Sequence, residues 1–191
     1  MFQSTRLRLR KMETTDTPTY HQWRNDVDVM ASTSLTLDLY TYEETQAFVE
    51  NVMRSDTHSK SYIIEQMGDC VAIGVTALIG IDTKNRNAEC ILDIGEKSYW
   101  GKGYGTEALS ILLSYAFLEL NLHRVSLRVF STNERAIHVY EKVGFVQEGR
   151  SKEAIFRMAN GSTLFIWAYY NPTTLTNHDY YQTCERRIIL N

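Results

Sequence analysis

Glycine is sparse in this chain and strongly clustered. The 191 residues contain ten glycines, and four of them, Gly95, Gly101, Gly103 and Gly105, fall within one short segment. Glycine adopts a positive φ angle without a steric penalty, and it lets the backbone approach a ligand closely. Because the rest of the chain uses so little glycine, we expect this segment to need a backbone geometry that other residues cannot supply.

The glycine cluster lies between a segment typical of a strand and a segment typical of a helix. Residues 88–94 alternate in character, and apolar residues recur at helical spacing after the cluster, at Leu109, Leu112, Ala116 and Leu120. The first N–H groups of a helix have no partner within the helix, and the helix dipole is positive at that end. A strand, a glycine-rich loop and a helix in this order therefore predict an anion-binding cradle.

The spacing of the glycines separates the known kinds of anion loop. A P-loop has Lys and then Ser or Thr directly after its last glycine, whereas Thr106 and Glu107 follow here. A dinucleotide-binding loop has the pattern GxGxxG, whereas this loop has GxGxG and lies in the middle of the chain. The diphosphate loop of an acetyl-CoA-dependent transferase and a plain tight turn remain as alternatives.

Composition narrows the class of protein. Hydrophobic residues make up 43% and charged residues 23%, and the net charge is −3, which is ordinary for a globular protein and gives no indication of nucleic-acid binding. No apolar run is long enough to span a membrane, and Met1–Arg6 lacks the apolar character of a signal peptide. The cysteines are widely spaced, so we expect inert thiols and a cytoplasmic protein without a metal site.

The periodicity predicts one α/β domain over residues 1–170 with a mixed sheet, followed by a polar tail over residues 171–191. The expected strands are Thr5–Arg10, Ser61–Glu65, Cys70–Leu78, Ala88–Ile94, Arg124–Phe130, Phe145–Glu148 and Leu164–Tyr170. The expected helices are Thr14–Val29, Tyr42–Met53, the segment after the glycine cluster, and Asn133–Val143.

Two motifs in this frame resemble the GNAT superfamily of N-acetyltransferases. The first is the loop Trp100-Gly101-Lys102-Gly103-Tyr104-Gly105-Thr106-Glu107-Ala108. The second is the segment Asn133-Glu134-Arg135-Ala136-Ile137-His138-Val139-Tyr140-Glu141-Lys142-Val143-Gly144-Phe145. The chain resembles the branch that contains ribosomal-protein N-terminal and spermidine acetyltransferases, over roughly residues 4–170. The resemblance implies a GNAT fold, in which helices flank a mixed and mostly antiparallel central sheet.

The resemblance also implies that the chain uses acetyl-CoA as a co-substrate. Main-chain groups of Ile94 and Gly95 would pair with the pantetheine arm, in a gap between the strands 88–94 and 124–130. The remaining residues of the implied binding set are Lys102, Gly103, Tyr104, Gly105, Thr106, Asn133 and Ala136. Trp100 departs from the Gln or Arg that is usual at its position, which matters little because backbone amides bind the diphosphate.

Transfer of an acetyl group from a thioester to an amine needs a neutral amine and a proton for the departing thiolate. Tyr140 occupies the family's general-acid position, and the alternative role for its side chain is packing in the core. Glu89 is the best candidate for the base, and its alternative role is that of a plain surface carboxylate. Asp93 and His138 are lesser candidates. The chain shows no pattern typical of a covalent acyl-enzyme or a metal site.

The acceptor is the part of the function that the sequence defines least. We expect the amine of a small molecule or a protein N-terminus, bound by the N-terminal helices and by loops around Trp23–Asn25, Ser32–Leu37 and Ser162. Between Met30 and Leu39 the only acidic residue is Asp38, which weakens the case for a polyamine. No nucleic-acid or membrane partner is expected, and a homodimer is possible for this branch. The alternatives are a catalytically silent GNAT-like domain that binds CoA and a nucleotide-binding module.

Overall fold

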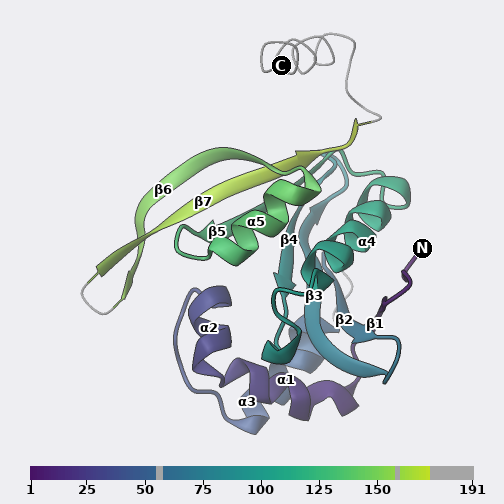
Figure 1. Ribbon diagram of the computed structural model, residues 1–191, viewed down its shortest axis with the longest axis vertical. Coiled ribbons are helices and arrows are strands. Elements are labelled where there is room, and N and C mark those ends of the chain that lie inside the picture. The colour runs from purple at the N-terminus through teal and green to yellow at the C-terminus, as the bar shows by residue number, and fades with distance from the viewer. Residues whose placement is uncertain (55–57, 158–159, 173–191) are drawn as a thin grey trace.

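The computed structural model describes residues 1–54, 58–157 and 160–172 of the chain (Figure 1). Of the predicted tail, residues 173–191 lie outside the described residues. The helices are α1 (Thr17–Arg24), α2 (Val27–Thr33), α3 (Tyr42–Phe48), α4 (Tyr104–Leu118) and α5 (Glu134–Val143). The strands are β1 (Leu7–Lys11), β2 (Lys60–Gln66), β3 (Val71–Asp82), β4 (Asn87–Asp93), β5 (Arg124–Phe130), β6 (Val146–Arg157) and β7 (Asn160–Tyr170).

The strands form a single seven-stranded sheet in the order β1-β2-β3-β4-β5-β7-β6. Every neighbouring pair is antiparallel except β4 and β5, which run parallel. The helix α4 connects these two strands, as a parallel connection requires a crossover. The prediction of a mixed and mostly antiparallel sheet is therefore confirmed.

The two parallel strands pair over only a short length. Their register runs from Asn87 opposite Arg124 to Glu89 opposite Ser126, and no pairing follows beyond that point. The end of β4 therefore has no strand on the β5 side, and its main-chain groups there are available to another extended chain. This is the gap that the family resemblance implies at this position.

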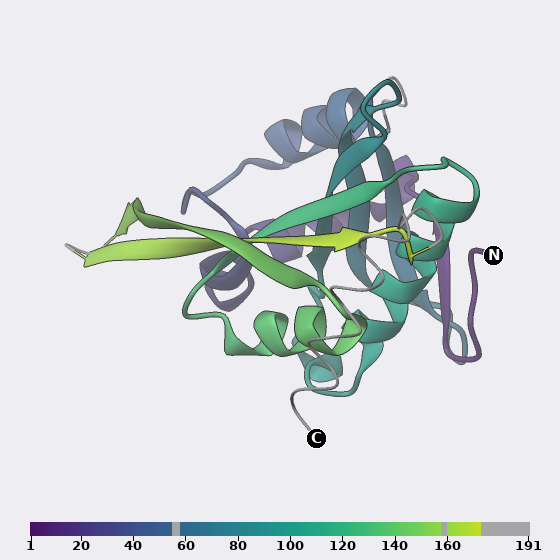
Figure 2. The same ribbon diagram turned by 90° about the horizontal axis from the view of Figure 1, so that it is seen from above.

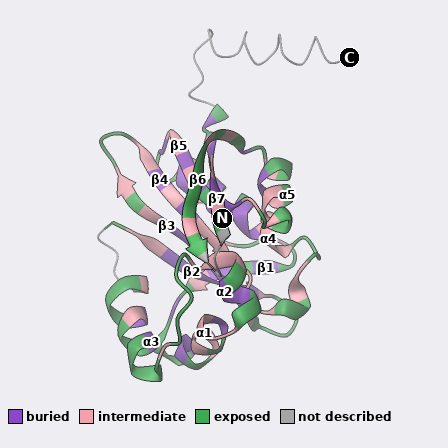
Figure 3. Cartoon of the chain, turned by 90° about the vertical axis from the view of Figure 1, so that its left-hand side faces the viewer, coloured by how far each residue is buried: buried purple, intermediate pink, exposed green. Residues whose placement is uncertain are grey.

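Helices cover both faces of the sheet. Figure 2 shows α3 on one side of the sheet and α4 with α5 on the other. The larger core lies under α4 and α5 and includes Leu109, Leu112 and Tyr140, whereas a smaller core under the N-terminal helices includes Trp23 and Val75. Figure 3 shows the buried residues concentrated in the strands and on the inner sides of the helices. The sheet thus separates two helical layers.

The structure differs most from the predicted elements in two places. The expected helix 14–29 is divided, because the Asp26 carboxylate accepts hydrogen bonds from the main-chain N–H groups of Asp28 (2.9 Å) and Val29 (3.3 Å) and begins a new helix there. The last two strands are longer than predicted and form a hairpin that projects from the body (Figure 1). Residues 150–154 of this hairpin are exposed, so they lack the burial pattern that reveals a strand in a sequence.

Asn171 extends the described fold by one residue beyond β7. Its side chain is buried and donates a hydrogen bond to the main-chain carbonyl of Leu122 (3.2 Å), while its main-chain N–H donates to His123 (2.9 Å). Within the described part of the chain, no helix is both long and apolar enough to cross a membrane.

Candidate active site

A cleft of about 760 Å³ lies between the N-terminal part of α4, helix α5 and the end of β4. Its walls include most of the residues that the family resemblance implies for acetyl-CoA. The predicted residues that line it are Ile94, Lys102, Gly103, Tyr104, Gly105, Thr106, Asn133, Ala136 and Tyr140. Two motifs about 30 residues apart in the sequence are therefore brought together in one cavity.

The glycine loop has the backbone geometry that the clustering predicts. Gly101 has a φ of +72° and Gly103, the N-cap of α4, has a φ of +83°. A Cβ atom at Gly101 would meet nothing within 4 Å, so it is conformation rather than space that favours glycine there. The loop leads into α4, and the first-turn N–H groups of a helix have no partner within the helix and can bind an anion.

Arg6 supports this loop from the edge of β1. Its Nε donates a hydrogen bond to Glu107 Oε2 (2.8 Å), and its Nη1 donates to the main-chain carbonyl of Lys102 (3.2 Å). The guanidinium also lies 4.5 Å from the ring centre of Tyr104. The loop is therefore held at both ends of its turn before any ligand binds.

The charges on the cleft wall suit a diphosphate. Lys102, Arg135 and Lys142 line the cleft, and Glu134 is the one acidic residue in its described lining. The Arg135 guanidinium lies 3.7 Å from the ring centre of Trp100, while the Trp100 indole donates a hydrogen bond to the main-chain carbonyl of Ile94 (2.7 Å). Trp100 therefore joins the loop to the end of β4 and positions a cation at the cleft.

Asn133 has two structural roles at the start of α5. Its Oδ1 accepts a hydrogen bond from the Ala136 N–H (3.2 Å), which makes it the helix N-cap. Its Nδ2 donates to the main-chain carbonyl of Ser32 in α2 (3.1 Å). The second contact brings Ser32 and Thr33 to the cleft wall, and nothing in the sequence indicates this long-range contact.

The end of β4 separates this cleft from a second cavity of about 430 Å³. Successive side chains of a strand point to opposite faces. Leu92 and Ile94 accordingly line the cleft, whereas Asp93 and Gly95 line the second cavity. Thr33 lines both, so the two spaces adjoin. Gly95, whose main chain the family resemblance places beside the pantetheine arm, lines the second cavity.

Tyr140 projects from α5 into the wall of the cleft. Its side chain is 6% exposed and packs against Phe145, with 5.8 Å between the ring centres. Burial raises the pKa of the Tyr140 hydroxyl, and the nearby Cys90 and Asp93 raise it further. A tyrosine that stays protonated at all ordinary pH values can donate a hydrogen bond or a proton to a thiolate.

Asp93 is the acidic residue that the structure brings to the second cavity. Burial raises the pKa of its carboxyl group to about 7. A general base is most effective when its pKa lies close to the working pH, and a desolvated carboxylate in a cavity has that property. The alternation of β4 places this carboxyl group at the division between the two cavities.

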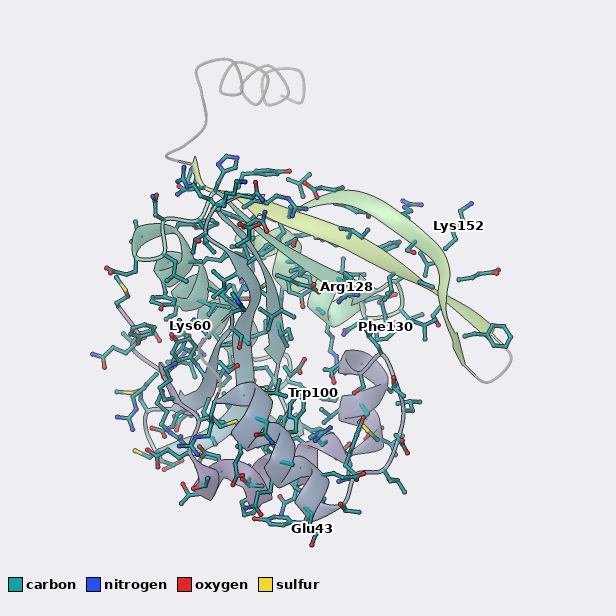
Figure 4. All side chains as sticks on the ribbon, turned by 180° about the vertical axis from the view of Figure 1, so that it is seen from behind. Glu43, Lys60, Trp100, Arg128, Phe130 and Lys152 are labelled. Atoms are coloured by element: carbon teal, nitrogen blue, oxygen red, sulfur yellow. The ribbon has the colours of Figure 1, made fainter. Side chains whose placement is uncertain are left out.

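Glu89 does not lie in either cavity. Its carboxylate forms an ion pair with Arg128 on the neighbouring strand, with 2.8 Å from Nε to Oε1, and both side chains are partly exposed. Figure 4 labels Arg128 and Phe130, both on β5, above Trp100 in that view. His138 lines the cleft, and Ser162 lines neither cavity. Among the described residues, no group of three or more His, Cys, Asp and Glu side chains is arranged to hold a metal ion.

Comparison with known proteins decides the family. The profile of the acetyltransferase (GNAT) domain matches residues 6–146, which span both motifs. The chain belongs to the GNAT acetyltransferase family. The spermidine N(1)-acetyltransferase of Escherichia coli is 33% identical over 156 residues, covering 78% of each chain. A putative ribosomal N-acetyltransferase of Bacillus subtilis is 32% identical over 123 residues, covering 57% of this chain and 67% of that one.

Solved structures of GNAT enzymes match the whole fold. The spermidine N-acetyltransferase of Vibrio cholerae in complex with CoA and spermine has a TM-score of 0.80 at 26% identity, covering 87% of this chain and 96% of that one. A dodecameric structure of the same enzyme has a TM-score of 0.74 at 26% identity, covering 91% and 98% of the two chains. This protein is accordingly an acetyl-CoA-dependent N-acetyltransferase of the GNAT fold that acetylates an amine.

Part of the GNAT site lies outside the sequence predictions. Arg135 and Lys142 belong to the second motif, but only the fold shows that they face the cleft. Trp23 and Arg24 were expected near the acceptor, and both line the second cavity. Tyr20, Tyr40 and Phe48 line it as well, and they come from three separate segments with no motif in common.

Proposed function

We propose that the acetyl group passes directly to the amine in a ternary complex, with acetyl-CoA in the cleft and the acceptor in the second cavity. The observation that carries this proposal is the end of β4, which contributes alternate residues to the two spaces. A direct transfer needs the two substrates on either side of a short boundary. The residues proposed to hold acetyl-CoA are those of the glycine loop together with Ile94, Asn133 and Ala136, and Gly95 borders the acceptor.

Tyr140 is the proposed proton donor to the departing thiolate of CoA. The pKa of a thiol is about 8.5, well below that of a buried tyrosine, so the hydroxyl stabilises the developing thiolate chiefly by donating a hydrogen bond. The position of Tyr140 in the wall of the cleft supports this role, and so does its protonated state. Lys102 and the first-turn N–H groups of α4 hold the diphosphate end.

Asp93 is the proposed base that accepts a proton from the incoming ammonium group, in the role that the sequence favoured for Glu89. Two observations support the change. Asp93 lines the second cavity and has a pKa near neutrality, whereas Glu89 is engaged with Arg128 outside both cavities. The proton passes from the amine nitrogen to the Asp93 carboxylate, and the neutral amine then attacks the thioester carbonyl.

The acceptor is proposed to be a small-molecule amine or a protein N-terminus, and the names of two relatives, a spermidine and a putative ribosomal N-acetyltransferase, support an amine acceptor. The dodecameric neighbour supports an oligomeric state, of which a homodimer is the simplest form. A cytoplasmic location remains the prediction from the sequence. The competing proposal is a silent domain that binds CoA without transfer, and it leaves Tyr140 and Asp93 without a role.

The proposal is tested by release of CoA from acetyl-CoA with a panel of primary amines. The wild-type protein should turn over at least one amine, and Tyr140→Phe should lower kcat by about 100-fold or more, because a positioned acid contributes about 10²–10⁴. The matched control is Tyr115→Phe, which removes a hydroxyl from α4 outside both cavities. If the wild type binds CoA but acetylates no amine, the proposal fails and the protein is a catalytically silent domain that binds CoA.

A further inference from the structure

The second cavity contains an arginine that the transfer chemistry does not use. Arg24, the last residue of α1, has its guanidinium carbon 3.7 Å from the ring centre of Tyr40, 4.6 Å from that of Phe48 and 5.9 Å from that of Tyr20. All three rings line the cavity with it. A planar guanidinium enclosed by aromatic faces is held in one place and oriented.

One end of this guanidinium lacks a partner. The Nη1 atom of Arg24 is buried, and no described residue accepts a hydrogen bond from it. No described carboxylate forms an ion pair with Arg24 either. A buried donor that is left unsatisfied lowers the stability of the protein, and the cost is larger when the group is charged. Such a group in a substrate cavity indicates that the substrate brings the acceptor oxygen.

The second cavity is lined by one side chain of each charge. Asp93 is the one acidic residue and Arg24 the one basic residue in its described lining. Tyr20 lines the cavity together with these two residues, and Arg24 and Asp93 form no ion pair with each other.

We propose that the acceptor is a small molecule that carries an anionic oxygen group, such as a carboxylate, as well as the primary amine. The amine lies at Asp93, next to the thioester, and the anionic oxygens accept hydrogen bonds from the Arg24 guanidinium at the other end of the cavity. Planar paired donors match a carboxylate or a phosphate particularly well. This inference rests on the proposed function, because it assigns the second cavity to the acceptor.

The same charges disfavour a polyamine. After one amine of a polyamine is placed at Asp93, its remaining ammonium groups have no second carboxylate in the described lining and lie near Arg24 instead. Asp38, the acidic residue of the connection between α2 and α3, is exposed and does not line the cavity. Like charges brought together in a desolvated space lower the affinity.

The test compares acceptors that differ only in the group opposite the amine. Amino carboxylates of increasing chain length, from α-amino acids to 6-aminohexanoate, are assayed by CoA release beside the matched alkylamines, the matched amides, spermidine and a peptide amide with a free N-terminus. With the wild type, kcat/KM for the best amino carboxylate should be about tenfold or more above kcat/KM for its matched alkylamine. One well-placed charged hydrogen bond contributes an effect of this size.

Substitution of Arg24 then shows whether the guanidinium causes this preference. Arg24→Met should reduce the ratio of kcat/KM for the carboxylate to kcat/KM for the alkylamine by about tenfold, through a raised KM for the carboxylate. Arg24→Lys keeps the charge and should restore part of the preference. Arg128→Met serves as the control, because Arg128 pairs with Glu89 outside both cavities.

Each other outcome has a defined meaning. A wild-type preference for spermidine, the alkylamine or the peptide amide overturns the inference, and so does a ratio that Arg24→Met leaves unchanged although the variant folds. Turnover of alkylamines without a preference leaves the proposed function intact and removes only the inference. The absence of turnover with every amine removes both.

Discussion

Gly95 lies directly against the indole ring of Trp23, at a distance that leaves no room for a side chain. A Cβ atom at Gly95 would lie 2.2 Å from Trp23 Cδ2 and 2.3 Å from Cγ. Trp23 is 7% exposed and belongs to the core under the N-terminal helices, so its ring cannot move aside. The contact joins the end of β4 to the N-terminal helices that border the second cavity. In the sequence Gly95 belongs to the glycine cluster, and nothing there indicates that it packs against Trp23.

Gly95→Ala should destabilise the protein by about 3 kcal/mol, at the upper end of the usual cost of overpacking. The melting temperature should then fall by about 6–12 °C, measured by calorimetry. Adding Trp23→Leu removes the ring that clashes with the new methyl group. The double variant should therefore lose less stability than the sum of the two single variants, and strict additivity would contradict the contact.

Gly103→Ala should weaken acetyl-CoA binding beyond its effect on stability. Alanine at a positive φ costs about 1–2 kcal/mol, and relaxation of that strain would turn the loop amides away from the diphosphate. We expect a KM for acetyl-CoA about tenfold higher, equivalent to one lost charged hydrogen bond. Gly80→Ala is the matched control, because Gly80 has a φ of +59° and open space around it but lies outside both cavities. An equal rise in KM for both variants would contradict the role of the loop.

The pH dependence of kcat/KM should report Asp93. Its carboxyl group must be ionised to accept the proton, so activity should rise through a pH of about 7 as that group loses its own proton. Asp93→Asn should remove this rise and lower kcat by about 100-fold or more. Glu89→Gln separates the two candidate bases. If Glu89→Gln retains the pH profile, Asp93 is supported as the general base. If Glu89→Gln loses the pH profile, Glu89 is the general base instead.

The same carboxyl group should make stability depend on pH. Its pKa is about 7 in the folded chain and about 3.9 when unfolded, so the folded state binds the proton more tightly and loses stability as the pH rises towards 7. Asp93→Asn has no group that titrates here, so its free energy of unfolding should not fall in this way. The difference in free energy of unfolding between Asp93→Asn and the wild type should therefore grow by about 2–3 kcal/mol between pH 5 and pH 8, or roughly 4–12 °C in melting temperature. A difference independent of pH would show that Asp93 is not desolvated.

Much of the cofactor site could be predicted from the sequence, because it depends on local backbone geometry. Gly101 and Gly103 take positive φ angles and Asn133 caps α5, as the loop and the helix signals predict. The division of the helix 14–29 at Asp26 was missed, although a capping residue was present as a signal. The length of β6 and β7 was missed because an exposed hairpin shows no alternation of buried and exposed residues.

The second cavity and the different surroundings of Glu89 and Asp93 follow from the tertiary structure alone. Glu89 and Asp93 face the same side of β4 in any strand model, and a sequence cannot say which of them meets an arginine. The register of β4 and β5 brings Arg128 to Glu89, and the divergence of these strands leaves Asp93 desolvated in a cavity. The sequence by itself determined the glycine loop and the family. Packing of distant segments determined which side chains are buried, paired or unpaired, and therefore which of them can carry out the chemistry.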